Sequence, residues 1–245
     1  MKKFSSGDLQ TTTISLETMH LGYSVDLMRK SKALSKEKNS GWSLMRMTRC
    51  ATSSILHGFC ALESSVNFIG YEMFFYKKSN RFIPVDKRDY LLNKFLKTWD
   101  KSNALEKLEF ILSHSNTPLP AKLHNELREL NNLRNWIAHG FVYQTTFLLD
   151  PNNDEHEQSY IVVDKEDDVD WKKKFPNTKF NALAELNYDD AQIALTIVLQ
   201  VLKIFSETFS RPYTLITCEG TANFKILWKD SFDIQEIVKS EFNQK

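Results

Sequence analysis

The chain has 245 residues, of which 42% are hydrophobic and 26% are charged, a balance that is ordinary for globular proteins and excludes wholesale disorder. Its formal net charge is +1, so no strong overall field draws it to nucleic acid or membrane, and a polyanion site has to be a local patch. Only seven glycines and six prolines interrupt long periodic runs, which favours an all-α protein.

The cysteines and the chain start indicate a reducing, cytoplasmic location. Cys50, Cys60 and Cys218 are too few and too scattered for a disulfide framework. Residues 1–10 hold two lysines but no apolar segment of the kind that secretory signals contain. Uncharged runs such as Ala191–Leu202 are shorter than the roughly 20 residues that a membrane helix needs. The sequence therefore predicts a cytoplasmic protein that does not enter a membrane.

Apolar residues at three- and four-residue steps predict four strong helices. In chain order these cover Trp42–Lys78, Asp86–His114, Leu123–Gly140 and Asn187–Phe209. A break in the second helix near Asp100–Asn103 stays open. Asn187 is a good N-cap, and a weaker helical pattern precedes the first helix over Ile14–Ala33.

Residues 145–187 have a different character from the helices around them. Thr146–Leu149 and Tyr160–Val163 are short β-rich runs on either side of an acidic loop, which predicts an inserted hairpin. The tail, Tyr213–Lys245, suggests a short strand or extended segment and a final helix near Asp233–Phe242. We therefore predict one domain over residues 1–245: an all-α, up-and-down helical bundle over residues 42–210 with a small β-hairpin-like insertion, short terminal extensions and a C-terminal extension over residues 211–245.

The third helix carries the most informative chemistry. Its apolar stripe consists of Leu123, Leu127, Leu130, Ile137 and Phe141, and Arg134 stands in that stripe where a leucine is expected. A second face consists of His124, Arg128, Asn131, Asn135 and His139. That face has no acid and no lysine, only groups that donate hydrogen bonds to anions or exchange protons.

The segment from Arg134 to His139, Arg-Asn-Trp-Ile-Ala-His, resembles the R-N-x-x-x-H signature of the HEPN domain family. These helical bundles occur in bacterial and archaeal toxin and phage-defence systems. The helices over Trp42–Ser210 fit the resemblance, and the insertion over residues 145–187 departs from a minimal member. The resemblance implies a metal-independent endoribonuclease without a cofactor, with RNA as substrate. It also implies a homodimer joined through the motif helix and, for a toxin, a cognate antitoxin.

The residues suit that role chemically. Cleavage by 2′-hydroxyl attack needs a base and an acid, and the imidazole of His139 serves either task because its unperturbed pKa is about 6.5. Arg134 would hold the phosphate with permanently charged donors. Asn135 would orient the imidazole or the RNA backbone, and Arg128 and Asn131 are weaker candidates for RNA binding. Arg134 and His139 lie about 140° apart around an ideal helix, so one straight helix does not aim both at one phosphate. Two chains across a two-fold axis could do so, and the resemblance implies such a shared site.

A structural interpretation stays open beside the catalytic one. Arg134 would then pair with Glu63 on the first strong helix, because an unpaired buried arginine costs several kcal/mol. His139 would satisfy the last carbonyl groups of its helix. The chain would be a non-catalytic dimeric binding or assembly module, or more distantly a nucleotide or small-molecule sensor. No metal site is predicted, because His57 and Cys60 are one turn apart without a second ligand pair.

Overall fold

The structure is a computed structural model that describes residues 16–36, 41–139, 146–149, 160–163, 171–211, 213–217 and 220–223. Its helices are α1 (Glu17–Leu34), α2 (Gly41–Phe74), α3 (Tyr90–Leu96), α4 (Ala104–His114), α5 (Ala121–His139), α6 (Trp171–Lys174) and α7 (Tyr188–Phe209). Single 3-10 turns cover Val85–Lys87, Trp99–Lys101 and Leu183–Glu185. Two antiparallel hairpins pair β1 (Thr146–Leu149) with β2 (Tyr160–Val163) and β3 (Thr214–Thr217) with β4 (Gly220–Asn223).

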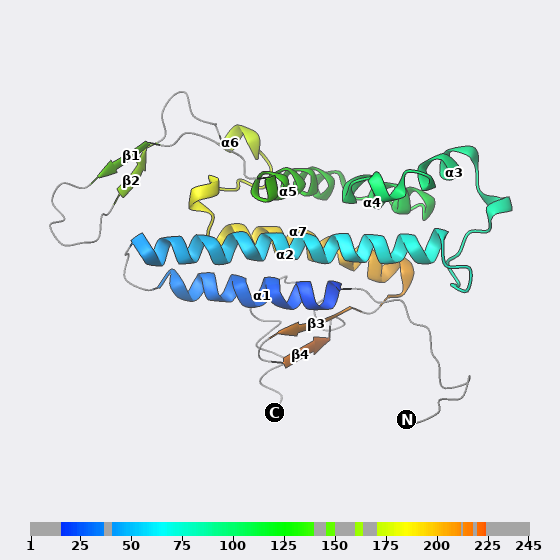
Figure 1. The fold of residues 1–245 in the computed structure, drawn as a ribbon, viewed down its shortest axis with the longest axis horizontal. Helices are drawn as coiled ribbons and strands as arrows, with labels where there is room; N and C mark the ends of the chain where they lie inside the picture. Colours follow the sequence, from blue (N-terminus) through cyan, green and yellow to red (C-terminus); the bar gives the residue numbers. More distant parts are fainter. Residues whose placement is uncertain are drawn as a thin grey trace, which may run out of the picture.

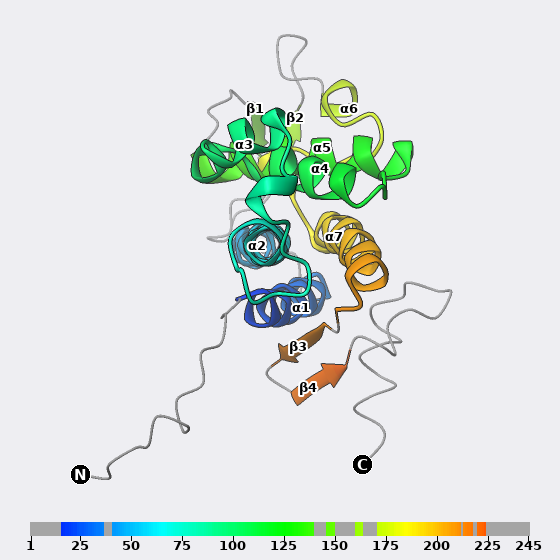
Figure 2. The same cartoon turned by 90° about the vertical axis from the view of Figure 1, so that its right-hand side faces the viewer.

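The helices form layers around α2 and α7 (Figures 1 and 2). These two helices lie side by side, α3, α4 and α5 cover one side of them, and α1 packs against the other. This arrangement confirms the predicted all-α helical bundle. The β1–β2 hairpin confirms the two strands predicted in the insertion, while Gly140, Phe141 and the predicted helix over Asp233–Phe242 lie outside the described residues.

The core confirms the apolar stripe expected of α2. Ile55, Phe59, Leu62, Val66 and Ile69 are each at most 2% exposed, because one face of a long helix meets neighbours on both sides. Their side chains join one continuous cluster with residues of α1, α4, α5 and α7. Burying such a side chain contributes about 1.5–3 kcal/mol, so this stripe is the main attachment of the other helices to α2.

Helix α1 belongs to the bundle, although the sequence placed it before the core that begins at residue 42. Leu21, Val25 and Met28 are at most 2% exposed. Ser24 Oγ donates to the carbonyl of Ser54 at 2.8 Å, and Ser54 Oγ donates to the carbonyl of Ser24 at 2.7 Å. The weak apolar pattern has a physical reason: α1 approaches α2 closely through small hydrogen-bonding residues rather than through large apolar ones.

The second predicted helix is wrong as one continuous element, and the break left open near Asp100–Asn103 is confirmed. Helix α3 begins after Asp89, whose side chain accepts a hydrogen bond from the amide of Leu92. Helix α4 begins after Asn103, which forms a capping box with Glu106 through two 3.0 Å bonds. Each cap stabilises a helix start by about 1 kcal/mol, so local capping overrides the continuous apolar pattern.

Trp99, in the 3-10 turn between α3 and α4, packs directly on the backbone of α2. The indole is 6% exposed, and a Cβ atom added to Gly70 would lie 2.2 Å from its ring. Only glycine at this turn of α2 therefore permits the contact. The indole also makes edge contacts with the rings of Phe74 and Phe95, at centroid separations of 5.9 and 5.8 Å.

The segment after α7 is tied back to α1 and α2. Arg211 forms an ion pair with Glu17 on α1, and its guanidinium carbon lies 3.7 Å from the ring centroid of Phe68 on α2. The hydroxyl groups of Tyr213 and Ser65 lie 2.6 Å apart, and burial raises the pKa of Tyr213. These contacts hold the end of α7 and the start of α1 against the same stretch of α2.

Helix α7 begins as predicted at Asn187, whose side chain accepts from the amide of Asp189 at 2.8 Å. Within the described part of the chain, it is the one helix long and apolar enough to cross a membrane, and half of its apolar window is buried in the bundle. A core helix of a soluble protein has the same length and composition. The expected absence of a membrane span therefore stays a prediction.

Candidate functional site

Helix α5, which carries the motif, packs against α2. Leu123, Leu127 and Leu130 are buried as expected, but the next buried position is Leu133, which has no exposed surface. The prediction that Arg134 continues the apolar stripe is wrong, because its side chain is 26% exposed. Leu133 and Arg134, three and four residues after Leu130, both lie near the apolar stripe. Leu133 points into the core, and Arg134 lies at the edge of the stripe.

Arg134 is held in place by three neighbours at this edge. Its Nη2 atom donates to Oε2 of Glu63 on α2 at 3.2 Å, and its Nη1 atom donates to Oδ1 of Asn135 at 2.9 Å. Its guanidinium carbon lies 5.1 Å from the ring centroid of Phe59. The Glu63 side chain is 35% exposed, so water screens the pair, which contributes about 0–1 kcal/mol. The pair orients the guanidinium more than it stabilises the fold.

His139 is the last residue of α5 and is exposed. Its side chain makes no hydrogen bond or ion pair within residues that the structure describes. Asn131 is partly exposed and Arg128 is exposed, and among the described residues neither forms a hydrogen bond or ion pair with Glu63 or Arg134. The structure thus joins Glu63, Arg134 and Asn135, and it leaves the other predicted site residues on accessible positions of the same helix.

His124, on the predicted polar face, has a structural role. Its Nε2 atom lies 2.7 Å from Oε1 of Glu109 on α4, so it links α5 to α4 across the turn that separates the two helices. This contact could not be read from the sequence, because the two residues are 15 positions apart on either side of a turn. His124 therefore serves as a matched histidine control for His139.

The His57 and Cys60 side chains have different neighbours. His57 faces α1, where its Nδ1 atom lies 3.0 Å from Nδ1 of His20; burial and the neighbouring His20 lower the pKa of His57. Burial and the nearby Glu63 raise the pKa of the Cys60 thiol, and Arg134 offsets only part of that. Among the described residues, no three His, Cys, Asp or Glu side chains gather closely enough to hold a metal ion.

Glu129 is the residue of α5 that the sequence analysis missed. It is 6% exposed and accepts hydrogen bonds from the amides of Asn177 and Thr178 at 3.0 and 2.8 Å, and from Thr178 Oγ1 at 2.7 Å. Burial alone would raise the pKa of Glu129, but these hydrogen bonds outweigh it and hold the pKa below the ordinary value of 4.5. Glu129 therefore fixes the loop before α7 onto the motif helix.

A second buried carboxylate accepts hydrogen bonds from the other end of that loop. Asp190, 1% exposed, accepts from the amides of Asn181 and Asn187 at 3.0 and 2.9 Å. Burial is the largest effect on this group, and it raises the pKa of Asp190 above its ordinary 3.8. The loop between α6 and α7 is thus hydrogen-bonded to a carboxylate at each end.

The candidate site consists of an oriented arginine at the edge of the bundle, an amide beside it, and an exposed histidine five residues further along the same helix. Such groups can bind a phosphate and exchange a proton. No protein-family model matches the chain, and no curated protein or solved structure matches it either.

Proposed function

We propose that this chain is a metal-independent endoribonuclease of the HEPN type, a toxin or phage-defence effector that acts as a homodimer. One observation carries the proposal. The Arg134 guanidinium is fixed by Glu63 and Asn135 at the edge of the bundle, yet a quarter of the side chain stays accessible. An arginine that is held in advance loses little freedom when it binds phosphate.

The donor inventory supports a phosphate ligand for Arg134. A guanidinium has five N–H donors, and Glu63 and Asn135 occupy two of them. No other group of the described chain accepts from this guanidinium. The remaining donors can therefore meet phosphate oxygens and stabilise the charge that develops on them during cleavage.

His139 supplies the proton transfers. The 2′-oxygen forms a bond to the adjacent phosphorus, and a neutral imidazole takes the hydroxyl proton. The bond from phosphorus to the 5′-oxygen breaks, and an imidazolium gives that oxygen a proton. The products are a 2′,3′-cyclic phosphate and a free 5′-hydroxyl.

A second copy of the chain completes the site. Five helical residues separate Arg134 from His139, so the two side chains diverge by about 140°. A two-fold axis through the motif helices would bring Arg134 of one chain toward His139 of the other. We therefore propose that the homodimer is the active form.

A cleavage assay tests the proposal. Purified protein incubated with single-stranded RNA in the presence of EDTA is expected to cut it and to leave 2′,3′-cyclic phosphate ends. Mass spectrometry of the products identifies those ends. RNA that stays intact with and without added divalent metal, from protein shown to be folded, contradicts the proposal.

A non-catalytic assembly module is the second candidate function. The observation that favours it is the contact of Arg134 with both Glu63 and Phe59, which links α5 to α2. In that case Arg134→Ala lowers the melting temperature, His139→Ala has no effect, and RNA is never cut. Under the first proposal both substitutions stop cleavage.

A further inference from the structure

A groove opens beside the C-terminal half of α2, and none of the motif residues lines it. It has a volume of about 640 Å³, within the range of about 300–1,000 Å³ that ligand pockets occupy. Its apolar lining consists of Phe68, Tyr71 and Phe75 from α2, Trp99 from the 3-10 turn, and Leu16 and Leu96 at its ends. We call the part lined by Phe68, Tyr71, Phe75 and Trp99 the aromatic groove.

Two of the rings in the aromatic groove are exposed and stacked on each other. Tyr71 and Phe75 are stacked at a centroid separation of 6.3 Å and an interplanar angle of 20°, and they are 45% and 40% exposed. Trp99 stands across from Phe75, with ring centroids 6.0 Å apart at 63°. Two exposed, nearly parallel rings beside a buried indole offer faces on which a further flat ring can stack.

A buried lysine lines the same groove. Lys107 of α4 is 7% exposed, its Nζ atom donates to Asn67 Oδ1 at 2.9 Å, and it lies 5.2 Å from the Trp99 ring centroid. No carboxylate of the described chain forms an ion pair with it. A buried ammonium has three donors and is costly to leave without acceptors. A ligand with acceptor atoms would satisfy those that remain.

The chain around the aromatic groove is strongly basic. Residues 77–107 hold nine lysines and arginines against four aspartates and glutamates, a local excess of five positive charges in a chain whose net charge is +1. Arg81 is engaged by Glu72, and Arg88 by the backbone carbonyl groups of Ile83 and Phe74. Apart from Lys107, the lysines of this segment are exposed; they are Lys77, Lys78, Lys87, Lys94, Lys97 and Lys101.

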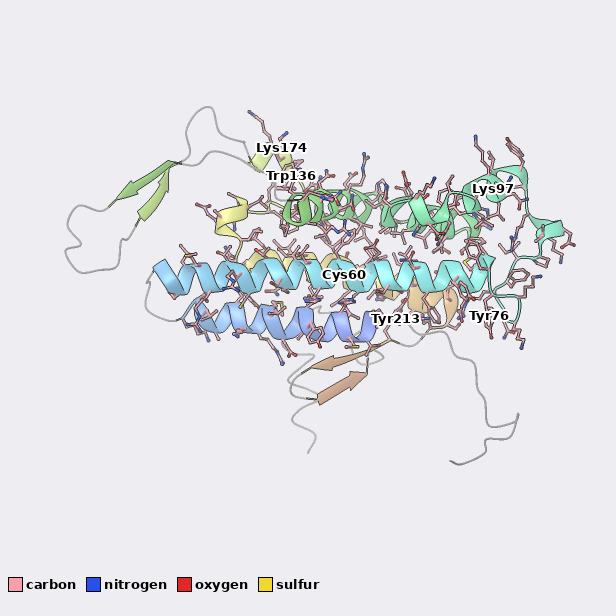
Figure 3. All side chains as sticks on the ribbon, viewed as in Figure 1. Cys60, Tyr76, Lys97, Trp136, Lys174 and Tyr213 are labelled. Carbon is pink, nitrogen blue, oxygen red and sulfur yellow. The ribbon has the colours of Figure 1, made fainter. Side chains whose placement is uncertain are left out.

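These features lie together at one end of the bundle, where Figure 3 places Tyr76 and Lys97. The aromatic groove is also close to the candidate site along α2. Asn67, which holds Lys107, lies one helical turn, about 6 Å, beyond Glu63, which holds Arg134. A ligand strand can therefore pass from one to the other along a single helix.

We propose that this end of the bundle binds single-stranded RNA, with one unpaired base stacked in the aromatic groove and the phosphates following the lysines. Exposed rings beside a basic surface are the arrangement that binds single strands without sequence preference. Ser64, Asn67 and Asp100 in the groove can meet the polar edge of a base. The choice of RNA as the strand rests on the proposed function, since the groove would hold substrate for the site at Arg134.

Binding to a single-stranded 2′-O-methyl oligoribonucleotide, followed by fluorescence anisotropy, tests the proposal. Tyr71→Ala is expected to weaken binding about 5- to 100-fold, because one stacked base contributes about that factor. Tyr71→Phe keeps the ring and is expected to bind like the native chain. Tyr23→Ala, an aromatic on α1 with 49% exposure against 45% for Tyr71, is the matched control and is expected to change nothing.

Charge reversal tests the lysines separately. Lys97→Glu is expected to weaken binding and to reduce its salt dependence, whereas Lys30→Glu on α1 makes the same change in net charge and is expected to have little effect. Three results would overturn the proposal. They are an equal loss of affinity in both lysine variants, native affinity in Tyr71→Ala, and equally tight binding of a duplex. The oligonucleotide has no free 2′-hydroxyl, so it cannot be cut. Binding without cleavage of ordinary RNA would contradict the ribonuclease proposal alone.

Discussion

Replacing His139 with alanine is expected to slow RNA cleavage by about 10²- to 10⁴-fold, the contribution of a positioned general acid or base. His139 is exposed at the last residue of α5 and makes no hydrogen bond or ion pair within the described residues. The substitution should therefore leave the melting temperature unchanged. The measurement is the initial cleavage rate of a labelled RNA in EDTA, together with a thermal melt of each protein.

His124→Ala is the control for that experiment. It removes a histidine from the same helix, but one that is paired with Glu109 of α4. Cleavage by the folded His124→Ala protein is expected at close to the native rate. Cleavage by His139→Ala at the native rate, or equal slowing by both variants, would show that the His139 imidazole does not transfer the proton.

Glu129→Ala is expected to lower the free energy of unfolding by about 2 kcal/mol or more. The substitution leaves the buried amide and hydroxyl of Thr178 without an acceptor, at about 1–3 kcal/mol for each such group, and it also removes the acceptor of the part-buried Asn177 amide. Urea denaturation measures the change. Glu126→Ala is the control on the same helix. Among the described residues Glu126 pairs only with exposed Lys122, at 3.7 Å, and such pairs contribute about 0.2–0.5 kcal/mol.

The same carboxylate makes this loss pH-dependent. The pKa of Glu129 is lowered in the folded chain, so its stabilisation is present above the unfolded value of 4.5 and is lost as the pH falls through the folded pKa. Asp190 acts in the opposite sense, because its raised pKa gives stability that is lost as the pH rises through the folded value. Asp190 is present in both the native and the Glu129→Ala protein, so its effect cancels when their free energies of unfolding are compared. The difference in free energy of unfolding is expected to become smaller as the pH falls below 4.5. A difference that does not change with pH would contradict the role of the Glu129 carboxylate.

Apolar periodicity correctly predicts the helices that bury mainly apolar side chains. Helices α2, α5 and α7 bury long stripes, and the Asn187 cap marks the start of α7 in the sequence itself. Helix α1 was placed outside the core because Ser24 and Ser54, rather than large side chains, make its closest contact with α2. The capping box at Asn103 can be recognised from neighbouring residues in the sequence. Whether the helix breaks there or continues along the apolar pattern depends on the packing of Trp99 on Gly70, which the sequence does not show.

The candidate site was predictable where it depends on one helix. The motif gave Arg134, Asn135 and His139, and the apolar register gave Glu63 as the partner of Arg134. The position of Arg134 beside the buried stripe depends on Leu133, which takes the space in the core. Glu129 could not be found, because its partners lie 48 and 49 positions away, within the insertion.

The central claim is that two chains share one site, and mixing two inactive variants tests it most directly. Arg134→Ala protein keeps His139, and His139→Ala protein keeps Arg134, so a dimer of one of each has one complete site. When the two are mixed under conditions that exchange subunits, half of the dimers are mixed, and cleavage is expected to recover to roughly a quarter of the native rate. A mixture that forms mixed dimers yet cuts RNA no faster than either variant alone would contradict the shared site.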